Sequence, residues 1–128
     1  MKKLSLIIIF LSSLLYSCIK DRIVIDPNNP LIGIWNYSDY KDNADVYTRS
    51  REFSNKHCYK FNSDGTLIER NISGFCATPP VSYSDYSGSW TILCDTIIQI
   101  NVTYFDGPRS YKLNIESLNA NSLKVIQI

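Results

Sequence analysis

The 128-residue sequence is poor in the residues on which several common kinds of function depend. It has one His, one Met and four Cys, which leaves little material for a His-rich metal site. Its net charge of +1 lacks the basic excess that is typical of nucleic-acid binding, so we expect no nucleic-acid partner. Five Gly and five Pro exclude a collagen-like or low-complexity chain. What remains is a chain of one-domain length, 45% hydrophobic, with nine Tyr.

The sequence also lacks a recognisable set of catalytic residues. His57 and Cys58 are adjacent, and adjacent residues of a strand point to opposite faces, so we do not expect a nucleophile–base pair. Together with Cys76 and Cys94 they have the residue types of a zinc site but not its short ligand spacing. We therefore expect no enzyme activity, no metal and no cofactor, and we expect His57 to lie on the surface.

The N-terminus has the pattern of a lipoprotein signal peptide. Two lysines precede an apolar stretch over 4–15 that is too short for a comfortable transmembrane span. Residues 15–18, Leu-Tyr-Ser-Cys, resemble a bacterial lipobox, whose Cys receives a diacylglycerol before cleavage on its N-terminal side. We expect residues 1–17 to be the signal peptide and Cys18 the lipid anchor. Residue 19 is Ile, not the Asp that retains many lipoproteins at the inner membrane, so we expect the outer membrane, on its periplasmic or exterior face.

The remainder of the sequence, from residue 31 onward, indicates short β-strands between turns and no convincing amphipathic helix. β-Branched and aromatic residues alternate with polar ones, for example over 98–104 and 111–116. Candidate strands lie at 31–38, 45–53, 56–61, 66–72, 87–94, 96–104, 109–116 and 122–128. We predict an all-β domain over 31–128 after a tether over 18–30. About eight strands with tight connections indicate an antiparallel up-and-down meander, closed as a barrel or packed as a sandwich.

One hairpin is specified in detail by its turn residues. Asn62, Asp64 and Gly65 fit a type I turn followed by a G1 bulge, with Gly where φ must be positive. This turn predicts a register in which Phe61 lies opposite Leu67.

Three motifs, taken in order, resemble those of lipocalin-like domains in small bacterial lipoproteins. They are Gly33-Ile34-Trp35, the Phe-x-x-Asp-Gly-Thr hairpin over 61–66, and Gly88-Ser89-Trp90 followed by Asp95-Thr96-Ile97. The resemblance covers about 31–128 and implies a small antiparallel up-and-down lipocalin-like β-barrel. One feature departs from the family. Typical lipocalins pack an Arg from near the chain end over the Trp, and no Arg follows Arg109 here.

The resemblance also bears on the three cysteines that remain after lipidation of Cys18. An exported domain lies in an oxidising compartment, so one disulfide is expected. Similar lipoproteins carry a Cys pair around the Asp-Gly hairpin, which favours Cys58–Cys76, with Cys76–Cys94 as the alternative. Under the favoured pairing, we expect Cys94 to be a small buried hydrophobic residue.

Two functions are consistent with such a barrel in the cell envelope. In the first, which the resemblance favours, interior aromatic side chains bind a small apolar or amphipathic ligand. The candidates for this role are Trp35, Phe61, Trp90, Tyr104 and Tyr111. In the second, the barrel is filled, and Tyr83 and Tyr86 of a long loop over 74–87 contact an envelope protein partner as an interaction or inhibitor module. A cavity above about 300 Å³ that reaches solvent would favour the ligand.

Overall fold

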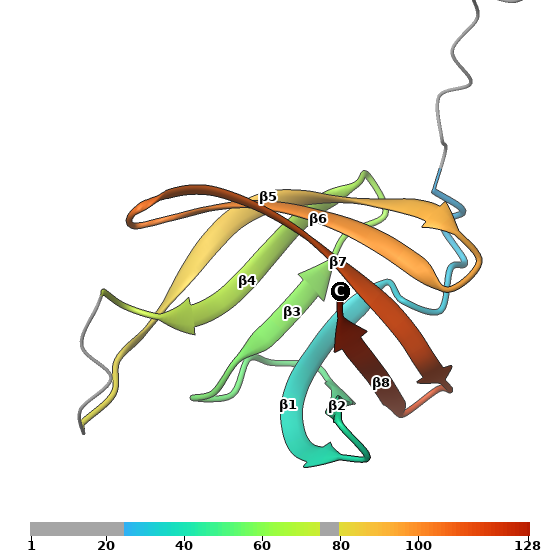
Figure 1. The fold of residues 1–128 in the computed structure, drawn as a ribbon, viewed down its shortest axis with the longest axis horizontal. Helices are drawn as coiled ribbons and strands as arrows, with labels where there is room; N and C mark the ends of the chain where they lie inside the picture. Colours follow the sequence, from blue (N-terminus) through green and yellow to red (C-terminus); the bar gives the residue numbers. More distant parts are fainter. Residues whose placement is uncertain (1–24, 75–79) are drawn as a thin grey trace, which may run out of the picture.

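The computed structural model describes residues 25–74 and 80–128 and consists of one closed barrel of eight antiparallel strands (Figure 1). The strands are β1 (Gly33–Lys41), β2 (Ala44–Ser50), β3 (Cys58–Phe61), β4 (Thr66–Ile72), β5 (Tyr83–Cys94), β6 (Ile97–Tyr104), β7 (Gly107–Leu118) and β8 (Ser122–Gln127). The predicted eight-stranded all-β barrel is confirmed, although β5 begins four residues earlier than expected, at Tyr83 rather than at residue 87. In the described part of the chain, no helix is long and apolar enough to cross a membrane.

The order of the strands departs from a simple meander at the first hairpin. Strands β3 to β8 each pair with the next, but β1 pairs with β3, and β2 pairs with β8. The connection over 51–57 must therefore cross β1. It is held there by Asn36, whose amide donates to the carbonyl of Glu52 (2.9 Å) and accepts from the backbone N–H of Ser54 (3.2 Å). This crossover brings His57 beside β1, where its carbonyl accepts from the N–H of Tyr37 (2.9 Å).

The barrel is filled by apolar side chains at the end where β1 begins. The buried members of this core include Leu31, Trp35, Phe61, Leu67, Trp90, Ile98, Ile100, Val102, Leu123 and Val125. The alternation of apolar and polar residues in the sequence assigns these side chains to the interior correctly. Both indoles are satisfied, since Trp35 donates to the carbonyl of Leu31 (2.8 Å) and Trp90 to that of Asn62 (2.9 Å). This end of the barrel is therefore a packed core.

The hairpin over 62–66 forms as its residues predict. The N–H of Asn62 donates to the carbonyl of Thr66 (3.0 Å), and Gly65 has a φ of +85°. Phe61 pairs with Leu67, which confirms the predicted register. One consequence is that Tyr59 pairs with Glu69 two residues further along the same ladder.

Arg49 of β2 takes the place of the arginine that the family carries near its chain end. Its guanidinium carbon lies 4.2 Å from the centroid of the Trp35 ring. The same guanidinium donates to the carbonyls of Ile32 (2.8 Å) and Ala120 (2.7 Å), and also to that of Pro30. No Arg follows Arg109 in the sequence, and the arginine over Trp35 comes from β2 instead.

The segment over 25–32 closes this end of the barrel. Ile25 and Ile32 pack against the core, and the N–H of Leu31 donates to the side chain of Asn29 (2.9 Å). Residues 25–30, which we assigned to the tether, therefore contact the barrel. Gly33 follows with a φ of +131°, and a Cβ there would lie 2.6 Å from Nη1 of Arg49, so the position requires glycine.

Of the four cysteines, the structure describes Cys58, which is buried, and Cys94, which is exposed. Cys58 is a buried free thiol, and its Sγ donates to the carbonyl of Lys56 (3.2 Å) in the crossing segment. Cys18 and Cys76 lie outside the described residues, so the lipidation stays a prediction. The expected Cys58–Cys76 disulfide is not present in this structure, in which the thiol of Cys58 is free. Cys94 is exposed, which corrects the expectation that it is buried. The register of β5 shifts between Ile92 and Cys94, and this shift ends the alternation on which that expectation depended.

Replacing Arg49 by Met should lower the free energy of unfolding by about 2–3 kcal/mol, because the carbonyls of Pro30, Ile32 and Ala120 lose their donor and Trp35 loses its cation. Urea denaturation followed by Trp fluorescence measures this change. Arg51→Met, at an exposed position, is the matched control. Equal stability of the two variants would contradict the role of Arg49.

Candidate functional site

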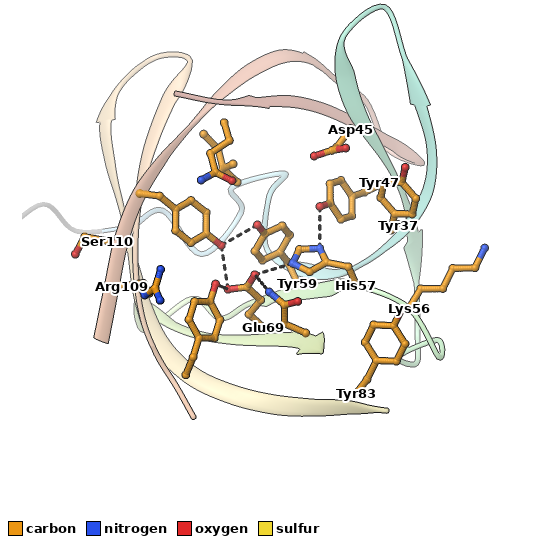
Figure 2. Close-up of a pocket in the computed structure, with 15 residues that line it drawn as sticks. Tyr37, Asp45, Tyr47, Lys56, His57, Tyr59, Glu69, Tyr83, Arg109 and Ser110 are labelled. Atoms are coloured by element: carbon orange, nitrogen blue, oxygen red, sulfur yellow. Dashed lines mark hydrogen bonds and ion pairs between the residues drawn. The ribbon is translucent and has the colours of Figure 1, made fainter. Parts of the chain in front are cut away.

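The end of the barrel opposite the packed core contains a cavity of about 640 Å³ that opens to solvent (Figure 2). Its wall is made by all eight strands and by the end of the crossing segment. The lining residues are Tyr37, Asp45, Tyr47, Lys56, His57, Tyr59, Glu69, Asn71, Tyr83, Tyr104, Arg109, Ser110, Tyr111, Leu113 and Gln127. Six of these residues are tyrosines and one is aliphatic, so the wall combines aromatic ring faces with polar groups.

Glu69 lies at the centre of this end of the barrel and is only 2% exposed. Its Oε1 accepts from Nε2 of His57 (2.6 Å) and from the amide of Asn71 (3.3 Å). Its Oε2 accepts from the hydroxyls of Tyr104 (2.6 Å) and Tyr111 (2.9 Å). Four donors thus surround one carboxylate, which is the kind of environment that a buried charge requires.

The network continues on both sides of Glu69. The hydroxyl of Tyr111 donates its one proton to Glu69. The hydroxyl of Tyr59, 2.8 Å from that of Tyr111, must therefore donate to the Tyr111 oxygen. Nδ1 of His57 lies 2.9 Å from the hydroxyl of Tyr47. With the Nε2 proton directed to Glu69, we assign from the network the tautomer in which Nδ1 accepts from Tyr47. A continuous chain of hydrogen bonds therefore runs from Tyr47 through Glu69 to Tyr59.

The local fold explains why these side chains meet. Glu69 has the same inward orientation as Leu67 because the two residues are two apart on β4. His57 points inward by the same alternation, two residues before Tyr59, and the crossing segment brings it to the open end. Tyr104 and Tyr111 come from the paired strands β6 and β7. The expectation that His57 lies on the surface is therefore wrong, because its ring faces the barrel interior.

The environment changes the acidity of four tyrosines. Burial raises the pKa of Tyr47, Tyr59, Tyr104 and Tyr111 above the ordinary value near 10, and the negative charge of Glu69 adds to the effect in each case. Their hydroxyls therefore stay protonated throughout the neutral pH range, as their roles as donors in the network require.

The structure separates the five aromatic candidates into two groups. Tyr104 and Tyr111 line the cavity, as expected of ligand-binding residues. Trp35, Phe61 and Trp90 instead belong to the packed core at the other end and do not line it. Their assignment to the ligand site is corrected, because alternation predicts which face of a strand a residue occupies but not its height along the barrel.

The two tyrosines that we assigned to a surface loop belong to β5. Tyr83 is its first residue and lies at the mouth of the cavity (Figure 2). Tyr86 packs edge to face against Tyr104, with ring centroids 5.2 Å apart, and donates to the carbonyl of Ile72 (3.0 Å). Tyr86 is therefore a partly buried strand residue behind Tyr104 and not part of an exposed loop.

Glu69, His57, Asn71 and Tyr47 did not emerge as site residues from the sequence. The one available signal was Glu69, a charged residue at an inward position of a strand whose register the 62–66 hairpin defines. The position of His57 depends on the crossing segment, for which the sequence contains no comparable signal.

A small antiparallel barrel that is packed at one end and hollow at the other has the architecture of a ligand-binding protein. A model of the lipocalin-like domain matches residues 31–125, and the chain belongs to this family. No curated protein and no solved structure matches the chain. The lipocalin-like barrel suggests small-ligand binding in general.

The buried tyrosines make the barrel sensitive to alkali. Below pH 10 they are protonated in both states, but above it the unfolded chain releases protons that the folded chain retains, so stability falls as pH rises. Each of the deeply buried Tyr47, Tyr59 and Tyr111 should cost about 1.4 kcal/mol per pH unit in this range, and the less buried Tyr104 should cost less. Phenolate absorbance, followed together with far-ultraviolet circular dichroism, should show four tyrosines ionising only as the barrel unfolds, and three in Tyr104→Phe. Ionisation of every tyrosine near pH 10 with unchanged dichroism would contradict this assignment.

Proposed function

We propose that this protein binds a small amphipathic molecule in the open end of its barrel. The observation that carries the proposal is the cavity of about 640 Å³, which opens to solvent and lies within the volume range of small-molecule sites. The packed core at the opposite end stabilises the fold, so the protein can fold although side chains do not fill the open end. A barrel that is not filled by its own side chains argues against the alternative of a filled interaction or inhibitor module for an envelope partner.

The lining favours an amphipathic ligand over a purely apolar one. Leu113 is the one aliphatic residue of the wall, whereas six tyrosines provide ring faces for apolar contact and hydroxyls for hydrogen bonds. The carboxylate of Glu69 and the amide of Asn71 add polar groups beside them. Such a wall orients a molecule that has both a flat apolar part and a polar group.

Binding is tested with the neutral amphipathic fluorophore N-phenyl-1-naphthylamine. We expect saturable binding, with NMR amide shifts confined to the open end around His57, Tyr59 and Tyr111. The indole N–H signals of Trp35 and Trp90 should not move, because both donate to carbonyls within the packed core. They are internal controls for the location of the site.

A matched pair of substitutions tests the same site. Leu113→Trp places a larger ring in the cavity wall and should weaken binding of the fluorophore several-fold. Leu93→Trp introduces the same side chain at a position that is 48% exposed and outside the cavity, and it should have no effect. Absence of binding to the wild type, or shifts confined to the Trp35 and Trp90 indoles, would overturn the proposal.

We further propose that Cys18 anchors the protein to the outer membrane. The lipobox-like sequence Leu-Tyr-Ser-Cys at residues 15–18 supports this proposal. Residues 19–24 separate the anchor from Ile25, and six residues span at most about 20 Å. The chain enters the barrel at its packed end, so the mouth of the cavity would face away from the membrane.

Labelled palmitate should enter the wild-type protein in cells and be absent from Cys18→Ala. Cys94→Ala, which removes an exposed thiol, is the matched control and should retain the label. Membrane fractionation should find the labelled protein in the outer membrane. Equal labelling of wild type and Cys18→Ala would refute the anchor.

A further inference from the structure

The tyrosine hydroxyls in the deep part of the cavity already donate their protons within the network. Tyr104 and Tyr111 direct their protons to Glu69, Tyr59 directs its proton to Tyr111, and Tyr47 donates to His57. Each of these hydroxyl oxygens keeps at least one lone pair that can accept a further hydrogen bond, although the oxygen of Tyr111 already accepts one from Tyr59. A ligand that reaches this depth therefore meets a set of acceptors.

The charged groups of the lining also favour a hydrogen-bond donor, because the buried one is a carboxylate. Glu69 is the buried carboxylate of the cavity, and its partner His57 is also hydrogen-bonded to Tyr47. Of the two cationic side chains in the lining, Arg109 is 60% exposed and paired with Asp106 (2.7 Å). Lys56 extends away from the cavity (Figure 2). Asp45 adds a second carboxylate to the wall.

The pKa values of the tyrosines are consistent with a negative charge in the cavity. Burial is the main cause of the raised pKa of Tyr47, Tyr59, Tyr104 and Tyr111, and the charge of Glu69 adds to it, since it would repel a phenolate. A field that opposes a negative group in the cavity attracts a positive one at the same place.

We infer that the ligand of this cavity carries a cationic, hydrogen-bond-donating group, a small amine in its ammonium form, whose hydrogen bonds the tyrosine oxygens accept and whose positive charge is favoured by the carboxylate of Glu69 behind them. This inference rests on the proposed function and names its ligand class. An ammonium offers three donors and no acceptor, which complements the acceptors of the cavity. The ring faces of the surrounding tyrosines add cation–π attraction. A carboxylate or phosphate ligand would instead meet the charge of Glu69.

Three ligands of similar shape and different charge test this inference. They are 2-phenylethylamine, 2-phenylethanol and phenylacetate, whose binding to the wild-type protein is measured by calorimetry and by NMR amide shifts. We expect the amine to bind at least about tenfold more tightly than the alcohol, as one charge-assisted contact would provide. The anion should bind most weakly.

Glu69→Gln removes the charge and keeps the shape. Its amide oxygen can still accept from Tyr104 and Tyr111, and its NH₂ can donate to the other tautomer of His57, so we expect the variant to fold. The amine should lose about tenfold in affinity, and the alcohol should be unaffected. Glu116→Gln makes the same change at an exposed position of β7 and should leave all three affinities unchanged.

The outcomes separate this inference from the function on which it rests. If the alcohol or the anion binds the wild type as tightly as the amine, with shifts at the same residues, the cationic ligand is refuted and the binding function stands. If neither these three compounds nor N-phenyl-1-naphthylamine binds, both are refuted. Should Glu69→Gln fail to fold, the ligand series on the wild type still decides.

Discussion

The carboxylate of Glu69 is the constraint on which the open end of the barrel depends. A charge that is 2% exposed is tolerated only where hydrogen-bond donors surround it, and here His57, Asn71, Tyr104 and Tyr111 provide them. Through these four residues, one carboxylate ties β4 to β6, to β7 and to the crossing segment before β3. In the part of the chain that the structure describes, no buried side-chain nitrogen or oxygen lacks a hydrogen-bond partner. Hydrogen bonds therefore fix the positions of the polar interior side chains, as packing fixes those of the apolar ones.

The two ends of the barrel are held by different forces. At the packed end, apolar burial dominates, and Arg49 joins the entry segment, β2 and the β7–β8 turn by donating to the carbonyls of Pro30, Ile32 and Ala120. At the open end, directional hydrogen bonds around Glu69 keep the side chains in place although apolar contacts do not fill the space. The cavity is compatible with a stable fold because the apolar core that stabilises the barrel lies at the end opposite the cavity.

The sequence predicts those features that depend on local periodicity. The eight strands, their inward faces and the 62–66 hairpin follow from alternation and turn chemistry, and the structure confirms them. The crossing of β1 by residues 51–57 depends instead on which strands pair at long range, which a single sequence does not encode as a local pattern. His57 inside the barrel results from that crossing, whereas Arg49 over Trp35 results from the register of the β1–β2 hairpin, and both were missed. Glu69 was predictable in principle, since the hairpin register places it opposite Tyr59.

The cavity is preorganised by the same bonds that stabilise it. Because the protons of Tyr104 and Tyr111 are directed to Glu69, the lone pairs of their oxygens have fixed directions before any ligand arrives. Rotation of either hydroxyl toward a ligand that needs a donor would leave the buried carboxylate short of a partner, at a cost of about 1–3 kcal/mol. A ligand that donates meets no such penalty, because it adds bonds to the network and breaks none. The need to stabilise one buried charge in the empty barrel thus also selects the polarity of the molecule that can occupy it.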